Sequence, residues 1–281
     1  MSRASAGRRD RRVTGTSLVL LLSALVACGG EEPSTATEAP SVQPTSSPSP
    51  SSIADRFAVG PDGEEVEIQC FGEGPPTVVF ESGTDANGIG GWPLALLTPL
   101  EEQAMVCTYD RPGTGLSDPP KADRRTLDDV VRLLHELLTT AEVPGPYVLV
   151  GQSGGGGIVA RFGDRYPGEV AGIAFLDVSA PVTDLAQEFP GPMGWNNPEH
   201  IDWPSAEKSL ALHPPRLPDD VPVLVVTASD GQSDVEDQSF WLALSPQSRQ
   251  VELQGGHDIH EDDPEAVLEE LRGLLASIEG G

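Results

Sequence analysis

The chain is 281 residues long and carries 44 acidic against 17 basic side chains, a formal net charge of −27. A surface this negative repels polyanions, so nucleic acid is excluded as an expected partner. We interpret the acidity as a solvated surface rather than as a binding site.

The N-terminus is basic, with five arginines among the first twelve positions. An apolar run too short to cross a bilayer follows and ends at Leu25-Val26-Ala27-Cys28. This order is typical of an export signal. The last four residues resemble the lipobox of bacterial lipoproteins, in which the cysteine is lipid-modified and becomes the first mature residue. The resemblance implies a signal peptide at 1–27, a lipid anchor at Cys28 and an extracytoplasmic, membrane-anchored protein. A plain signal peptide with an incidental cysteine is the alternative.

Residues 28–54 are predicted to form a disordered tether that begins at the lipidated cysteine. From Gly29 to Ser52 the chain is almost entirely Glu, Pro, Ser, Thr, Ala and Gly, which leaves no periodic apolar positions to bury. Residues 55–281 have the length of one α/β domain and contain no internal repeat, so we expect a single domain there.

Within that domain, apolar strand patterns alternate with helical ones. The predicted strands are 66–71, 77–80, 104–109, 147–150, 170–176, 223–226 and 249–253. The predicted helices are 92–103, a helix capped by Thr126, 156–166 and 264–278. This alternation predicts an α/β fold with a mostly parallel, doubly wound sheet and functional loops at the carboxyl ends of its strands. A proline-rich stretch at about 178–220 has little periodicity and is interpreted as a lid over a pocket.

The most informative motif is Gly151-Gln152-Ser153-Gly154-Gly155, where a buried strand pattern gives way to a helix. In a strand–serine–helix turn the serine backbone is strained, and the positions two before and two after it tolerate no Cβ. The N-terminus of the following helix favours a developing anion. The pattern arises readily by chance in a chain with 31 glycines, so its context carries the interpretation of Ser153 as a nucleophile.

Four motifs, taken in order, resemble the α/β-hydrolase superfamily. They are Glu81-Ser82-Gly83 after one strand, the turn-rich loop 110–118 after the next, the serine motif, and Gly256-His257-Asp258-Ile259-His260 near the C-terminus. The similarity extends from Glu65 to the C-terminus. It implies the α/β-hydrolase fold, with a serine nucleophile followed along the chain by an acid and then a histidine base.

A serine hydroxyl needs a base within hydrogen-bond reach, and that base must be oriented by an acid. His257 occupies the position of the superfamily's histidine. His260 competes with it as the base, or as a metal ligand beside it. For the acid, Asp230 at the end of one strand pattern is favoured, and Asp177 at the end of the preceding strand is the alternative.

The other candidates carry less weight. Asp234 and Asp237 are weaker choices for the acid. Of the remaining histidines, His135 falls within a predicted helix, and His200 and His213 fall within the proline-rich stretch. We expect these three at the surface or in packing contacts.

The resemblance also implies backbone donors for an oxyanion. One is the N–H of Gly154, and the other is expected after the 77–80 strand, at Gly83 or Thr84. Serine precedes Gly83 where many relatives have histidine, so the choice between Gly83 and Thr84 stays open. Asp110-Arg111 either organises the loop beneath the site or forms a structural turn held by an internal ion pair.

The leading hypothesis is a serine hydrolase that cleaves carboxylic esters or related acyl compounds through an acyl-enzyme. We expect it to act as a monomer on a small-molecule acyl substrate. The alternatives are another reaction in the same fold, such as peptide or C–C cleavage or haloperoxidase-like chemistry, or a catalytically inactive tethered binding protein. Epoxide hydrolases and dehalogenases are disfavoured because they carry aspartate at the position of Ser153. No motif indicates a cofactor or a metal ion, and none is expected.

Two cysteines lie within the predicted domain, Cys70 and Cys107. In the fold that the chain resembles, the strands that contain them are sheet neighbours, which can bring two Cα atoms within disulfide range. Export supplies an oxidising environment, so a disulfide is predicted. Two buried free thiols are the alternative.

Overall fold

A computed structural model describes residues 52–84, 87–188 and 190–280. The predicted signal peptide, Cys28 and nearly all of the predicted tether lie outside the described residues. Within the described part of the chain, no helix is both long and apolar enough to cross a membrane.

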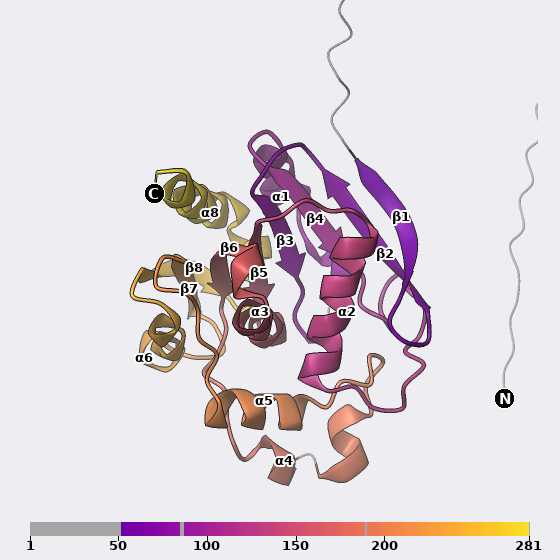
Figure 1. Ribbon diagram of the computed structural model, residues 1–281. Helices are drawn as coiled ribbons and strands as arrows, with labels where there is room; N and C mark the ends of the chain where they lie inside the picture. The colour runs from indigo at the N-terminus through magenta and orange to yellow at the C-terminus, as the bar shows by residue number, and fades with distance from the viewer. Residues whose placement is uncertain (1–51, 85–86, 189, 281) are drawn as a thin grey trace, which may run out of the picture. The chain divides into compact units, whose positions relative to one another are not determined.

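An eight-stranded sheet forms the centre of the described domain (Figure 1). Its strands in chain order are β1 (Ile53–Val59), β2 (Glu64–Phe71), β3 (Thr77–Glu81), β4 (Met105–Tyr109), β5 (Tyr147–Gln152), β6 (Val170–Leu176), β7 (Val223–Asp230) and β8 (Ser248–Gly256). In space the order is β1-β2-β4-β3-β5-β6-β7-β8. The first two pairings, β1 with β2 and β2 with β4, are antiparallel, and all later pairings are parallel. The predicted mostly parallel, doubly wound sheet is confirmed.

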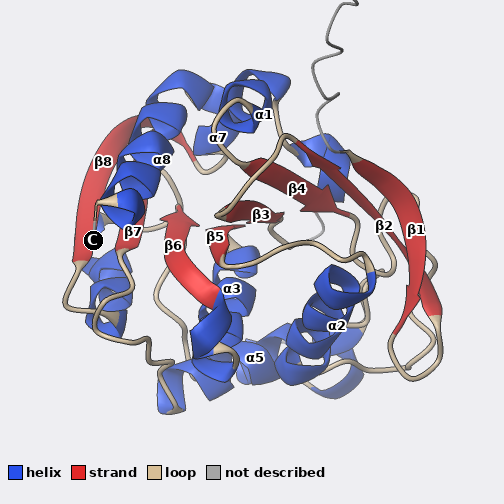
Figure 2. Ribbon diagram, turned by 45° about the horizontal axis from the view of Figure 1, so that its top comes forward, coloured by secondary structure: helices blue, strands red, loops and turns tan. Residues whose placement is uncertain are grey.

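Helices cover both faces of this sheet (Figure 2). The α-helices are α1 (Leu94–Glu101), α2 (Leu127–Thr140), α3 (Gly154–Arg165), α4 (Leu185–Glu188), α5 (Trp203–Leu212), α6 (Val235–Gln238), α7 (Ile259–Asp262) and α8 (Pro264–Glu279). The short 3-10 helices are η1 (Gly88–Gly91), η2 (Pro167–Glu169), η3 (Gly191–Trp195) and η4 (Ser239–Leu244). One core packs α2 and α3 against the sheet and the other packs α1 and α8 against the opposite face. Strand β5 is buried along its whole length, which fits its apolar sequence.

Helix α2 illustrates how local sequence sets an element. Thr126 accepts a hydrogen bond from the N–H of Asp129, and the Asp129 carboxylate accepts one from the N–H of Thr126. This capping box satisfies two of the N–H groups that a helix start leaves without partners. The apolar residues of the helix then recur on one face and are buried against the sheet.

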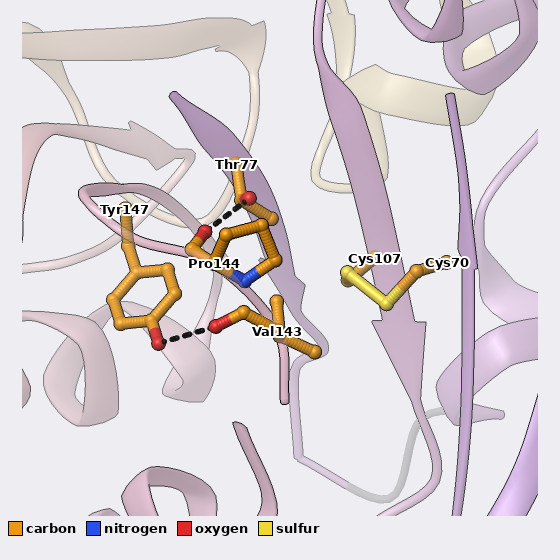
Figure 3. The surroundings of a disulfide bond; sticks show 6 residues. All are labelled: Cys70, Thr77, Cys107, Val143, Pro144 and Tyr147. Carbon is orange, nitrogen blue, oxygen red and sulfur yellow. Dashed lines mark hydrogen bonds between the residues drawn. A yellow bond between two sulfur atoms is a disulfide. The ribbon is translucent and has the colours of Figure 1, made fainter. Parts of the chain in front are cut away.

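The predicted disulfide is present between Cys70 of β2 and Cys107 of β4 (Figure 3). The two residues stand directly opposite each other in the antiparallel β2–β4 pair, with Cα atoms 4.1 Å apart. Both side chains are fully buried. The bond therefore ties the antiparallel margin of the sheet to its parallel part.

Two features differ from the sequence-based expectation. Strand β1, which begins at Ile53, was not predicted, because its exposed positions leave no strong apolar pattern. The proline-rich stretch is not irregular throughout, since it contains α4, η3 and the ten-residue α5. Helix α5 begins with a capping aspartate, Asp202, whose side chain accepts a hydrogen bond from the N–H of Ser205.

Candidate active site

Ser153 lies at the junction of β5 and α3, as the motif predicted. Its backbone has φ +49° and ψ −127°, a conformation that non-glycine residues rarely adopt. A Cβ on Gly151 would collide with the first turn of α3, and a Cβ on Gly155 would collide with the backbone of Glu81 and Ser82. The predicted reason for both glycines of the motif is confirmed.

The loop after β3 lies beside Ser153, because β3 pairs with β5 in parallel and Glu81 is opposite Gly151. A Cβ on Gly83 would lie 3.1 Å from the Cβ of Ser153. A Cβ on Gly154 would collide with the hydroxyl of Thr84. The three predicted oxyanion residues, Gly83, Thr84 and Gly154, are therefore gathered around Ser153.

Arg111, from the loop after β4, holds the backbone of the β3 loop. Its guanidinium donates to the carbonyl oxygen of Ser82 and to that of Gly83, each at 2.6 Å. The carbonyl and N–H of one peptide unit point in opposite directions. With both carbonyls turned toward Arg111, the N–H groups of Gly83 and Thr84 point away from it.

The same guanidinium is held by two buried carboxylates, Glu81 of β3 and Glu199 of the segment before α5. Tyr109 donates its hydroxyl hydrogen to Glu81. Burial raises the pKa of Glu81, an effect that Arg111 and Tyr109 only partly oppose. The pKa of Arg111 lies well above its usual value, because the two carboxylates outweigh its burial. Two roles are predicted for Asp110-Arg111, organising a loop or forming a structural turn, and the contacts of Arg111 with the β3 loop support the first.

His257 follows β8 and meets Asp177, the residue directly after β6. The Nδ1 atom of His257 lies 2.7 Å from Oδ2 of Asp177. The Asp177 side chain is fully buried and also accepts hydrogen bonds from Gln238 and from the backbone N–H groups of Ala228 and Gln232. Burial alone would raise the pKa of Asp177, but the hydrogen bond from His257 and these donors lower it below its usual value. The group therefore stays ionised.

The preference for Asp230 as the partner of the histidine is wrong in this structure. Strand β7 extends as far as Asp230, which pairs with Gly256 in the sheet while its side chain is exposed. Its carboxylate makes no hydrogen bond or ion pair within the described residues. Asp234 caps α6 instead, and Asp237 accepts a hydrogen bond from the N–H of Ala180. Asp177, the alternative, is the carboxylate that contacts His257.

The other ring nitrogen of His257 faces the side chain that precedes the serine. The amide nitrogen of Gln152 lies 3.3 Å from Nε2 of His257, and it also donates to the carbonyl oxygen of His257. A donor at Nε2 requires that this nitrogen carry a lone pair, and Asp177 favours a proton on Nδ1. Among the described residues, the structure contains no direct hydrogen bond between Ser153 and His257.

Three of the remaining histidines make packing or hydrogen-bond contacts, whereas His213 is exposed at the end of α5. His135 stacks on Tyr166 and pairs with Glu169, and His200 bonds to the backbone of Ala122. His260 is buried and packs against Trp92, and burial lowers its pKa. Within the described residues, no group of three or more His, Cys, Asp or Glu side chains could hold a metal ion.

Two cavities meet at Ser153. The first, called the lid cavity, measures about 430 Å³, exposes mostly apolar surface and is lined by residues such as Val182, Met193 and Trp203 from the segment between β6 and β7. The second, called the histidine cavity, measures about 490 Å³, exposes mostly polar surface and is lined by His257 and His260 among others. Ser153, Thr84 and Gln232 line both cavities.

Comparisons with known proteins agree with this architecture. A sequence family described as alpha/beta hydrolase fold matches residues 76–193. The uncharacterized Bacillus subtilis (strain 168) protein YqjL is 26% identical over 206 residues, which are 68% of this chain and 80% of YqjL. A thermophilic esterase from Thermogutta terrifontis aligns with a TM-score of 0.61 at 21% identity, over 81% of this chain and 99% of the esterase. An ancestral haloalkane dehalogenase aligns with a TM-score of 0.62 at 20% identity, over 80% of this chain and 100% of the dehalogenase.

The eight-stranded sheet, the family match and these neighbours define the class. The chain has the α/β-hydrolase fold, and its residues 76–193 match the sequence family described by that fold. Because esterases and dehalogenases share this fold, the chemistry of this protein has to be argued from its site.

Proposed function

We propose that this hydrolase cleaves carboxylic esters or related acyl compounds through a covalent acyl-serine intermediate. The observation that carries the proposal is the 2.7 Å contact between His257 Nδ1 and the buried carboxylate of Asp177, beside a strained Ser153 in the same cavity. In this proposal Ser153 is the nucleophile, His257 the base and Asp177 the acid that orients it.

The burial of Asp177 and its hydrogen-bond donors support this proposed role. An ionised carboxylate at Nδ1 fixes the proton on that nitrogen, so that Nε2 keeps its lone pair to accept a proton. The amide of Gln152 competes for the same lone pair in the absence of substrate. Catalytic hydrogen bonds often tighten only when substrate binds, so we expect Ser153 to replace Gln152 at Nε2 in the substrate complex.

The reaction then has two balanced halves. The Ser153 oxygen attacks the acyl carbon while its proton passes to Nε2 of His257, and the bond to the alcohol oxygen breaks as that proton moves to the leaving group. Water next gives a proton to Nε2 and attacks the acyl carbon. The bond to the Ser153 oxygen breaks, that oxygen recovers the proton, and a carboxylic acid is released.

Negative charge on the carbonyl oxygen needs donors in both halves. The N–H of Gly154 at the start of α3 is one proposed donor. The orientation of the β3 loop by Arg111 supports an N–H from Gly83 or Thr84 as the other.

Purified protein assayed on p-nitrophenyl esters of graded chain length tests the proposal, with Ser153→Ala as the control. We expect turnover by the unaltered protein and covalent labelling of Ser153 by a fluorophosphonate. A protein that neither turns over esters nor takes the label, yet binds small molecules, would support the inactive binding protein instead. Cleavage of peptides or C–C bonds without esters would support another reaction in the same fold.

We also propose that the mature protein begins at a lipid-modified Cys28 and is tethered outside the cytoplasm. The support is the basic, apolar and Leu-Val-Ala-Cys order of the N-terminus. Mass spectrometry of the native N-terminus is expected to detect diacylglycerol on Cys28, and Cys28→Ala is expected to release or mislocalise the protein. An unmodified, freely secreted wild type would contradict the anchor.

A further inference from the structure

The direction in which an ester lies across Ser153 follows from the place of the base. His257 lines the histidine cavity and not the lid cavity. The alcohol oxygen must receive its proton from His257 in the first half of the reaction. The alcohol part of the ester is therefore expected in the histidine cavity, which leaves the lid cavity for the acyl part.

The walls of the two cavities differ in chemistry. Glu207 is the single ionisable side chain lining the lid cavity within the described residues. It accepts a hydrogen bond from the N–H of Val182, and burial raises its pKa. Surroundings that disfavour a charged group suit an apolar acyl chain.

The histidine cavity is rich in hydrogen-bond acceptors. The carboxylates of Asp258 and Glu261 line it, and within the described residues no lysine or arginine does. His260, whose relative exposure is 6%, also lines this cavity. Its Nδ1 atom has no hydrogen-bond partner among the described residues. A buried polar atom without a partner costs stability unless a ligand or water satisfies it.

We propose that the substrate is an ester of an apolar acyl group with an alcohol that donates hydrogen bonds and carries no negative charge, such as a polyol or an amino alcohol. The proposal rests on the proposed ester hydrolysis. It assigns the acyl group to the lid cavity and the alcohol to the histidine cavity. An anionic alcohol would face two carboxylates, and no lysine or arginine among the described residues lines the cavity to offset them.

Three butyrate esters of nearly equal size test the alcohol preference on the full-length protein. Their alcohols are glycolamide, which donates hydrogen bonds, isobutanol, which is apolar, and glycolate, which is anionic. Each kcat/KM is divided by the rate of hydrolysis of the same ester by hydroxide, which removes differences in intrinsic reactivity. We expect glycolamide first, isobutanol second and glycolate at least tenfold below glycolamide.

Two variants test whether residues lining the histidine cavity cause this order of kcat/KM values. Glu261→Gln is expected to raise the glycolate-to-glycolamide ratio about three- to tenfold, and His260→Phe is expected to lower the glycolamide-to-isobutanol ratio by a similar factor. Glu269→Gln, which removes an exposed carboxylate on α8 that lines neither cavity, is the charge control and should leave both ratios unchanged. Ratios that neither variant moves would overturn the alcohol assignment.

Two isomeric esters test the direction of binding. Ethyl hexanoate has its long chain on the acyl side and hexyl acetate has it on the alcohol side. Val182→Trp, which narrows the lid cavity, is expected to lower kcat/KM about tenfold for ethyl hexanoate and less than threefold for hexyl acetate. Val235→Trp, at a similarly exposed valine outside both cavities, is the matched control.

The outcomes separate this inference from the proposed function. A larger loss on hexyl acetate, or a preference for the anionic ester, would overturn the inference while leaving ester hydrolysis intact. A protein that hydrolyses none of the esters and whose Ser153 is not labelled by a fluorophosphonate would overturn the proposed function, and the inference with it.

Discussion

The two sides of Ser153 are built in different ways. On one side, the loop after β3 is held by a fully buried ionic network in which Arg111 joins Glu81 and Glu199. On the other side, His257 is held by a single buried carboxylate, Asp177, and keeps 24% of its side chain exposed. The β3 loop with its proposed oxyanion donors is therefore held by more buried contacts than His257, the proposed base, which could exchange Gln152 for the serine as its partner.

The largest expected effect comes from removing the proposed nucleophile or the proposed base. Ser153→Ala and His257→Ala are each expected to lower ester turnover by about 10⁴- to 10⁶-fold, and the double variant should be hardly worse, because the pair acts as one unit. Steady-state kinetics on proteins of verified fold measures this. Activity near the unaltered level in His257→Ala would move the role of base to His260.

The second largest effect is expected from changing the carboxylate that contacts His257. Asp177→Asn should lower kcat by about 10³- to 10⁴-fold, because an amide at this position no longer fixes the proton on Nδ1 of His257. Asp230→Asn, the matched change at the exposed aspartate, should stay within about twofold. Steady-state kinetics on both variants measures the two losses. A larger loss of kcat in Asp230→Asn than in Asp177→Asn would restore Asp230 as the proposed acid.

A smaller effect is expected on the other side. Arg111→Lys keeps the charge but loses the fork that grips Ser82 and Gly83 together. The β3 donors should then be misplaced only in part, so kcat is expected to fall about 10- to 100-fold with KM nearly unchanged. Arg56→Lys, at a partly exposed ion pair with Asp118, is the control. A rise in KM with constant kcat would contradict a role in transition-state stabilisation.

The disulfide should affect stability and not turnover. Replacing both Cys70 and Cys107 by alanine removes a cross-link between residues 37 positions apart. Chain-entropy estimates put the resulting loss in the free energy of unfolding at about 3–4 kcal/mol. Denaturant unfolding measures the change. Activity of the folded variant at low temperature is expected to match the unaltered protein, since neither cysteine lines either cavity at Ser153.

The smallest effect concerns Glu207 and pH. Burial raises the pKa of this carboxyl above its ordinary value, so the folded state binds more protons than the unfolded state as pH rises above about 4.5. Stability therefore falls with rising pH across that window. Glu207→Gln removes this fall, and its melting temperature at pH 7 should exceed that of the unaltered protein by about 1–3 °C. An equal gain at pH 4 would assign the effect to something other than ionisation.

Several features could be predicted because their cause is either local or follows from the order of the strands. The glycines around Ser153 are required by backbone that passes within a few residues or on the adjoining strand, and their spacing appears in the sequence. The disulfide followed from strand order once the fold was inferred. In both cases the deciding contact depends on topology alone.

The carboxylate that contacts His257 could not be predicted because it depends on which side chain becomes buried. Asp177 directly follows β6 and Asp230 ends β7, so both lie at the carboxyl edge of the sheet. The deciding contacts come from the turn after β7, where Gly231 leaves room for the Asp177 carboxylate and Gln232 donates to it. The glycine directly after Asp230 therefore makes room for the carboxylate of Asp177, a contact that its sequence neighbours do not indicate.

The pairing of Arg111 with Glu199 was also beyond sequence analysis. The two residues are 88 positions apart, and Glu199 sits in the proline-rich stretch, where no periodicity marks a buried position. A buried carboxylate of this kind is recognisable only when its cation is known. Asp110-Arg111 was the one available signal, and it had two equally acceptable interpretations.

The positive φ of Ser153 has a consequence for variants that retain no activity. A non-glycine residue in such a conformation costs roughly 1–3 kcal/mol, whereas glycine adopts it with little cost. Ser153→Gly is therefore expected to raise the free energy of unfolding while it removes the proposed nucleophile. Selection for heat resistance alone would therefore favour a change that removes the proposed nucleophile, so that stability and the proposed activity make opposite demands on this one position.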